Sequence, residues 1–172
     1  MRAGHLTIRL EQPPDIPSVR DVNRSAFPTS AEADLVDVLR TAAAPIISLV
    51  ADIDESIVGH ILLSPVTLGT WPDLKVMGLA PMAVRPPWQR QGIGSALAAA
   101  GIESCRQLGS EAIVVLGHAR FYPRFGFVPA SRFGIGCEYD VADEHFMVLE
   151  LDPGILSGRP GTIRYHPAFA GF

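Results

Sequence analysis

A glycine-rich turn leads into an apolar helical pattern near the middle of the chain. It runs Gln-Arg-Gln-Gly-Ile-Gly-Ser from Gln89 to Ser95, and Gly92 and Gly94 leave little side-chain bulk there. The first turn of a helix presents unpaired backbone N–H groups, and the helix dipole adds partial positive charge at the same end. The local charge agrees, because residues 74–102 include three basic residues and no acidic one. The pattern therefore favours an anion such as a phosphate.

Three phosphate-binding patterns compete for this turn, beside the simpler interpretation of an ordinary helix start with solvated arginines. The P-loop pattern is excluded because no Gly-Lys-Ser/Thr occurs in the chain. The dinucleotide fingerprint fails in part, since its third glycine would fall on Leu97 and the acidic Glu111 begins the next strand instead of ending it. What remains is the spacing Gln89-x-x-Gly92-x-Gly94.

That spacing resembles the pyrophosphate-binding loop of the GCN5-related N-acetyltransferases (GNAT family). The run from residue 78 to 86, Gly-Leu-Ala-Pro-Met-Ala-Val-Arg-Pro, resembles the family's fourth strand. The run from 121 to 127, Phe-Tyr-Pro-Arg-Phe-Gly-Phe, resembles its Tyr-x-x-x-Gly-Phe segment. With Val58-Gly59-His60 before these runs and residues 161–169 after them, the likeness extends over nearly the whole chain. Within the family, the chain resembles the YhbS-like subgroup.

The resemblance implies an acetyltransferase that moves an acetyl group from acetyl-CoA to a primary amine by direct attack in a ternary complex. It implies that the turn holds the pyrophosphate, and that the main chain of the fourth strand pairs with the pantetheine arm where the fourth and fifth strands splay apart. No metal is expected. The residues implied in cofactor binding are Met82, Ala83, Val84, Gln89, Arg90, Gln91, Gly92, Ile93, Gly94 and Ser95.

Tyr122 is the candidate catalytic residue that the resemblance implies. A phenol of pKa ~10 can donate a proton to a leaving thiolate whose conjugate acid has a pKa of ~8.5. The structural alternative is an aromatic side chain packed under Phe125 and Phe127. The chain departs from many family members before this residue, because Gly117 to Arg120 leaves room for only a short turn.

A general base is also required, since an amine of lysine type has a pKa of ~10.4 and arrives protonated. The candidates are Glu32, His60 and His118, each with a structural or solvated role as the alternative. Three arginines in a second acid-free stretch can meet the 3′-phosphate or an anionic acceptor, or remain on the surface: Arg120, Arg124 and Arg132.

Composition limits the remaining classes. The chain has 172 residues, 48% of them hydrophobic and 19% charged, with a net charge of -4. These values exclude a disordered polyelectrolyte, disfavour sequence-independent binding to nucleic acid, and predict one domain over residues 1–172. Cys105 and Cys137 are expected as reduced thiols. No apolar run has the length of a signal peptide or membrane span, so we expect a cytoplasmic protein without a membrane partner.

Strand and helix periodicities alternate along the chain and predict a mixed α/β fold of GNAT type. The expected sheet is mostly antiparallel and twisted, flanked by helices, with one parallel, splayed pair of strands around the long helix. Pro81 cannot donate to a strand ladder and predicts an irregularity. Strands are predicted at 6–10, 46–53, 57–68, 76–84, 111–117, 146–151 and 162–165, helices at 13–27, from about 31 to the alanines before Pro45, and at 89–108, and a loop at about 133–145.

Two rival functions stay open at this point. A non-catalytic acyl-CoA sensor would bind CoA, but no free thiol would be released with any amine. A nucleotide or nicotinamide binder would bind NAD or ATP, and CoA would not displace it. The acceptor can be a small-molecule or a peptide amine, and the protein a monomer or homodimer.

Overall fold

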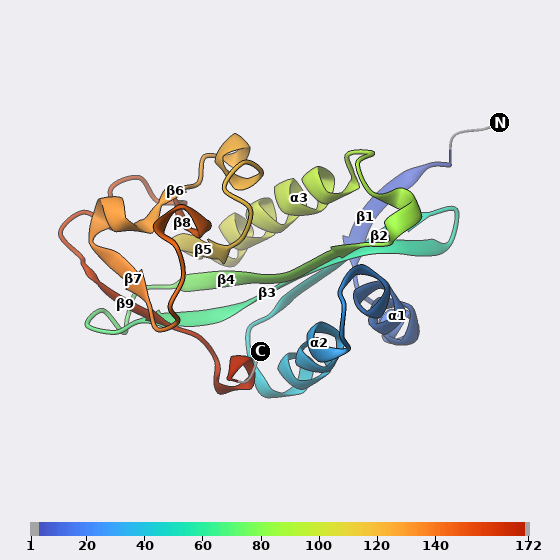
Figure 1. Ribbon diagram of the computed structural model, residues 1–172, viewed down its shortest axis with the longest axis horizontal. Coiled ribbons are helices and arrows are strands. Elements are labelled where there is room, and N and C mark those ends of the chain that lie inside the picture. The colour runs from blue at the N-terminus through green and yellow to red at the C-terminus, as the bar shows by residue number, and fades with distance from the viewer. Residues whose placement is uncertain (1–3, 171–172) are drawn as a thin grey trace.

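One mixed sheet forms the middle layer of the molecule (Figure 1), and the computed structural model describes residues 4–170. Its strands follow the order β1-β2-β3-β4-β5-β8-β6, while β9 pairs with the end of β3 and with β7. The strands are β1 Leu6–Leu10, β2 Ile47–Ile53, β3 Ser56–Leu68, β4 Val76–Val84, β5 Ala112–Leu116, β6 Val128–Pro129, β7 Ile135–Cys137, β8 Phe146–Glu150 and β9 Gly161–Arg164. The helices are α1 Ile16–Ala26, α2 Ala31–Ala42 and α3 Ile93–Leu108.

Helices cover both faces of this sheet, with α3 on one face and α1 and α2 on the other (Figure 1). Side chains along β3 alternate between the two cores as strand geometry requires: Ile61 and Leu63 belong to the α3 cluster, and Leu62 to the α1–α2 cluster. All three are fully buried, which stabilises the fold by about 1.5–3 kcal/mol for each side chain. Gly101 lets α3 approach closely, since a Cβ there would lie 3.0 Å from Leu63 Cδ1.

The strands β4 and β5 are the parallel pair, and they part halfway along β4. Their pairing begins at Val76 and Ala112 and ends at Leu79 and Val115. Opposite the same point, the register between β3 and β4 shifts. Pro81 lies in this irregular stretch and has no N–H to give to a ladder. The splayed pair and the irregularity predicted at the proline are therefore both confirmed.

The start of the long helix differs from the prediction. The apolar period suggests a helix from Gln89, but α3 begins at Ile93. Arg90 and Gly92 have φ angles of 61° and 85°. Such left-handed conformations cannot belong to a right-handed helix, so the segment before Ile93 is a separate turn.

The expectation of a loop at about 133–145 is wrong in part. Residues Ile135–Cys137 form β7, which pairs in parallel with β9. A strand of three residues is too short to show a period, and its partner lies far along the chain. The short strand β6 was missed for the same reason.

Two other expectations concern the cysteines and the membrane. Cys105 and Cys137 are both free thiols. No helix within residues 4–170 combines the length and the apolar character that crossing a bilayer demands.

Candidate active site

The turn before α3 presents a row of unpaired amides. Gly92 is the N-cap of α3, and its carbonyl accepts the first helical hydrogen bond, 3.0 Å from the amide of Ala96. No side chain caps this helix, and the amides from Arg90 to Ser95 bond to no other described residue. The side chain of Ile93 is buried, so only its main chain faces outward. These amides and the helix dipole together form an anion-binding surface.

The side chains of the turn brace it against β4. Gln89 donates through Nε2 to the carbonyl oxygen of Val84, at 2.9 Å, and Gln91 donates to the carbonyl of Pro87, at 3.1 Å. Arg85 turns inward, and its Nε lies 3.0 Å from the carbonyl oxygen of Ile57. The two glutamines are thus bound to main chain, and the exposed basic side chain of this turn is Arg90.

The edge of β4 beyond Leu79 lacks a neighbouring strand on the β5 side. The amide of Arg85 points to β3, because it donates to Val58 at 2.8 Å. Peptide groups alternate in direction along a strand, so those of Met82 and Val84 face the gap. The Val84 carbonyl is already occupied by Gln89. Ala83 points its side chain into the α1–α2 core.

The turn and the strand edge lie next to each other. A Cβ placed on Gly94 would lie 3.8 Å from Met82 Cε, 3.9 Å from Phe121 Cζ and 4.0 Å from a methyl group of Val84. The structure thus brings together the turn, the end of β4 and the segment that contains Tyr122.

Tyr122 begins a 3-10 turn, Tyr122–Phe125, after the short connection that the sequence predicts. Its ring meets Phe121 and Phe127 edge-on, with centroids 5.0 and 5.6 Å away, and it lies against Gly117, where a Cβ would collide with it. The side chain is only 6% exposed, and burial raises the pKa of Tyr122 to about 12. The hydroxyl bonds to no other described residue and stays protonated at neutral pH.

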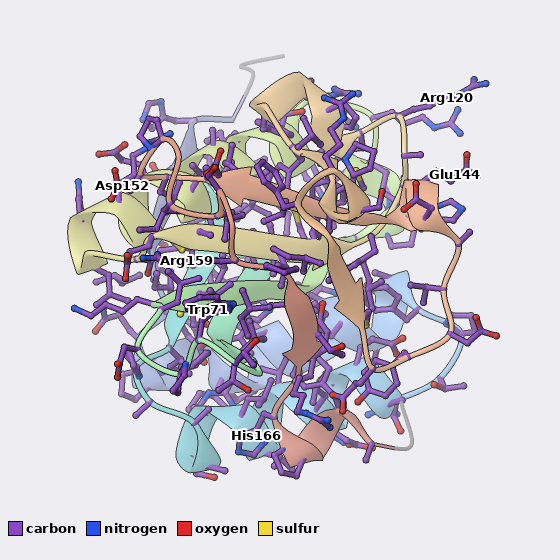
Figure 2. All side chains as sticks on the ribbon, turned by 90° about the vertical axis from the view of Figure 1, so that its left-hand side faces the viewer. Trp71, Arg120, Glu144, Asp152, Arg159 and His166 are labelled. Carbon is purple, nitrogen blue, oxygen red and sulfur yellow. The ribbon has the colours of Figure 1, made fainter. Side chains whose placement is uncertain are left out.

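The other polar candidates near this segment are on the surface. His118, Arg120, Arg124 and Arg132 are exposed, and Figure 2 shows Arg120 extending outward at the rim of the molecule. The guanidinium of Arg124 lies 4.6 Å from the centroid of the Phe121 ring. Because Phe121 also borders Gly94, Arg124 carries a positive charge to the neighbourhood of the α3 turn.

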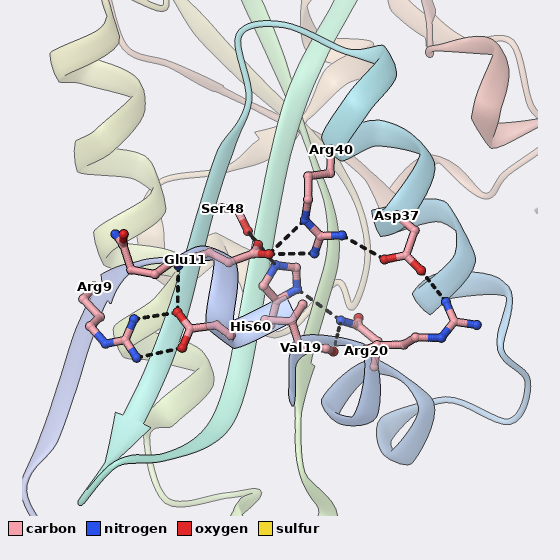
Figure 3. A network of polar contacts seen from close by, with 11 residues as sticks. Arg9, Glu11, Val19, Arg20, Asp37, Arg40, Ser48 and His60 are labelled. Carbon is pink, nitrogen blue, oxygen red and sulfur yellow. Dashed lines mark hydrogen bonds and ion pairs between the residues drawn. The ribbon is translucent and has the colours of Figure 1, made fainter. Parts of the chain in front are cut away.

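His60, the second candidate base, is fully buried in a polar network under α1 (Figure 3). Its Nδ1 lies 3.1 Å from the side-chain nitrogen Nδ2 of Asn23, and its Nε2 lies 2.8 Å from Ser48 Oγ. The Asn23 nitrogen can only donate, so Nδ1 accepts and Nε2 carries the proton. Burial, and with it the nearby Arg40 charge, lowers the pKa of His60 despite the opposing effect of Glu11. Neither ring nitrogen is free to take a proton from a substrate.

Glu11 completes this network. It accepts hydrogen bonds from Ser48 and from Arg40 Nε, the latter at 2.9 Å. Burial alone would raise the pKa of Glu11, but the nearby His60 ring, the hydrogen bond from Ser48 and the charge of Arg40 outweigh it, so the pKa is lowered. The carboxylate is thus held ionised beside a neutral histidine.

A cavity of about 350 Å³ opens where β4 and β5 part. Ala80, the first residue of β4 beyond the pairing, and Leu116 at the end of β5 line one side of it. Glu32 is not among its lining residues, although its buried Oε2 has no hydrogen-bond partner in the described part of the chain. No motif singled out the residues of the other walls, which lie in the stretch expected as a loop at about 133–145, at the end of the strand expected at 162–165, and beyond that strand: Tyr139, Asp140, Val141, Tyr165 and Phe169.

The geometry agrees with what comparison with known proteins finds. The model of the acetyltransferase (GNAT) family matches residues 16–127. The chain belongs to the GNAT family. It is 34% identical to the N-acetyltransferase YhbS of Escherichia coli K12 over 168 residues, covering 97% of this chain and 100% of that protein. It is 40% identical to the N-acetyltransferase YjhQ of the same organism, covering 96% and 93%.

Solved GNAT structures share the whole fold. The crystal structure of Escherichia coli YhbS in complex with CoA has a TM-score of 0.92 and 34% identity, covering 99% of this chain and 94% of that one. A GNAT acetyltransferase of Brucella melitensis in complex with acetyl-CoA has a TM-score of 0.79 and 34% identity, covering 97% and 99%.

Among residues 4–170 no three His, Cys, Asp or Glu side chains gather as a metal site would require.

The buried histidine of this GNAT chain predicts how stability depends on pH. The folded state resists protonating His60, whereas the unfolded chain accepts that proton below pH 6.5. The unfolded state then binds more protons, so the free energy of unfolding should fall as the pH drops below 6.5. In denaturant titrations from pH 8 to 5, His60→Gln, which can keep both hydrogen bonds, should flatten this decline.

The same exchange at an exposed position, His118→Gln, controls for the substitution itself. An equal decline in wild type and His60→Gln would show that His60 is not responsible for it.

Proposed function

We propose that this GNAT chain is an N-acetyltransferase that moves an acetyl group from acetyl-CoA to a primary amine in a ternary complex. The observation that carries the proposal is the row of unpaired amides at the start of α3, which lies beside the free edge of β4 at the gap. The related structures with CoA and acetyl-CoA support the same cosubstrate. The site residues implied by the sequence are proposed to act as follows.

The amides from Arg90 to Ser95 would hold the diphosphate of the cosubstrate. They need no rearrangement, because no other described residue uses them. The exposed charges of Arg90 and Arg124 add attraction for the anion. Gln89 and Gln91 act indirectly, by holding the turn against main-chain carbonyls.

The free edge of β4 would take the pantetheine arm. The peptide groups of Met82 and the amide of Val84 face the gap, so the amides of the arm can pair with them as an added strand does. Ala83 lies between these two residues in the strand, and its side chain packs in the α1–α2 core. The arm thereby directs the thioester toward the point where β4 and β5 part.

The reaction forms a C–N bond and breaks a C–S bond. A neutral amine attacks the thioester carbonyl, the thiolate leaves, and the nitrogen loses one proton while the sulfur gains one. Complete transfer from Tyr122, whose pKa is about 12, to a free thiolate of pKa ~8.5 is uphill. Tyr122 therefore acts as a hydrogen-bond donor to the sulfur while the C–S bond breaks, when the negative charge develops.

The incoming ammonium must first lose a proton. His60 is buried with both nitrogens bonded, and neither Glu32 nor His118 lines the cavity. We therefore assign this proton to water in the open cavity.

A negative charge at the turn should weaken cosubstrate binding without harming the fold. Ser95→Asp places a carboxylate in the first turn of α3, where the helix dipole favours it by about 0.3–1 kcal/mol. The same charge repels a diphosphate, so the Kd of acetyl-CoA measured by calorimetry should rise about ten-fold or more. Ala99→Asp, on the exposed side of α3, is the matched control. Unchanged affinity in Ser95→Asp would place the diphosphate elsewhere.

Removing the Tyr122 hydroxyl should slow the chemical step. Because this hydroxyl bonds to no described residue, Tyr122→Phe should keep the thermal stability and the acetyl-CoA affinity of the wild type. With a true acceptor its kcat should fall by about 10² to 10⁴-fold in a thiol-release assay. An unaltered kcat would remove Tyr122 from the mechanism. CoA binding without thiol release from any amine would instead favour a sensor.

A further inference from the structure

The cavity at the strand gap is small and lies on one side of the sheet. Its volume of about 350 Å³ is at the lower end of the range for small-molecule sites. Ala80, Leu116, Tyr165 and Phe169 belong to or pack on the α1–α2 core, whereas Tyr122 belongs to the α3 core. A thioester held in the gap would thus have Tyr122 on one face and this cavity on the other. The cavity is the place for an acceptor.

Three aromatic rings form a continuous wall of this cavity. The ring centroids of Tyr139 and Tyr165 are 5.9 Å apart, and those of Tyr165 and Phe169 are 5.1 Å apart. Such a wall buries an apolar body, and the faces of the rings attract an ammonium group.

The wall of the cavity carries a negative charge. Asp140 is the charged residue among those that line it. It lies in a segment, residues 138–144, with four carboxylates and no basic residue. Glu144 of this segment lies at the rim of the face in Figure 2. An acidic entrance concentrates cations and repels a ligand that carries its own carboxylate.

Tyr165 is the central ring of this wall. It lines the cavity and is 9% exposed, and its main-chain amide donates to Glu138 Oε1 at 2.7 Å, which fixes the residue in place. Its hydroxyl is buried and makes no hydrogen bond with any described residue, so a ligand meets the ring of Tyr165 and not its hydroxyl.

On the basis of the acetyltransferase function proposed above, we propose that the acceptor is a small primary amine on a ring-sized apolar body that carries no carboxylate. The three rings pack on this body, and together with Asp140 they select the ammonium group. Tyramine is the probe of this class, and L-tyrosine differs from it by one carboxylate.

The test compares these two amines in a thiol-release assay with acetyl-CoA. The kcat/KM for tyramine should exceed that for L-tyrosine by at least ten-fold, and Asp140→Asn should reduce this ratio several-fold. Asp143→Asn, which removes the same charge from the same segment but not from the cavity wall, should leave the ratio near its wild-type value. Equal use of tyramine and L-tyrosine, or an unchanged ratio in Asp140→Asn, would overturn the proposal.

The two levels of inference fail in different ways. If amines of other classes release thiol and tyramine does not, the acceptor class is wrong while the acetyltransferase function stands. If no amine releases thiol although acetyl-CoA binds, the acetyltransferase function is wrong and the acceptor class falls with it.

Discussion

The strands β4 and β5 pair for only four residues, and the rest of the site depends on the point at which they stop. Up to Leu79 and Val115 the two strands share a ladder, and beyond it their edges face an opening. An unpaired strand edge in the middle of a sheet is normally unfavourable, because its N–H and C=O groups have lost their partners. Here that edge is flanked by the α3 turn on one side and by a cavity on the other, so the unmet hydrogen-bonding capacity lies where an extended ligand can use it.

Charge and burial divide this opening into unlike regions. The turn before α3 offers amides and exposed arginines, which suit an anion. The cavity beside Asp140 has an acidic entrance and aromatic walls, which suit a cation on an apolar body. Two substrates of opposite charge can therefore approach one gap without competing for the same surface. The buried network around His60 lies on the α1–α2 side, where it holds α1, β2 and β3 together.

Local pattern located one half of the candidate site. The glycine spacing before α3, the proline in β4 and the aromatic segment around Tyr122 are each contiguous in sequence, so they can be found by pattern, and the family resemblance that they carry implies the roles proposed for them. The register of the parallel pair was not predictable in detail, but the irregularity at Pro81 indicated where it would fail.

The other half depends on contacts between distant segments. Tyr139 and Tyr165 meet because β7 pairs with β9, and neither short strand carries a period that reveals the pairing. His60 lies in an apolar strand, and nothing nearby in sequence indicates that Asn23 and Ser48, from two other segments, satisfy its ring nitrogens, or that Glu11 lies beside it. The left-handed conformations of Arg90 and Gly92 likewise depend on the turn as a whole. The apolar period does not reveal them, so the helix predicted from it begins too early.

The hydrogen bond from Gln89 to the Val84 carbonyl has a consequence for how the molecule measures its ligand. It joins the turn that faces the diphosphate to the strand that faces the arm, so the two move as one piece. The distance between the turn and the strand edge is therefore set by the protein before any ligand binds. An acyl carrier with a shorter or longer arm could still bind through its diphosphate, but its thioester carbon would lie short of the gap or beyond it.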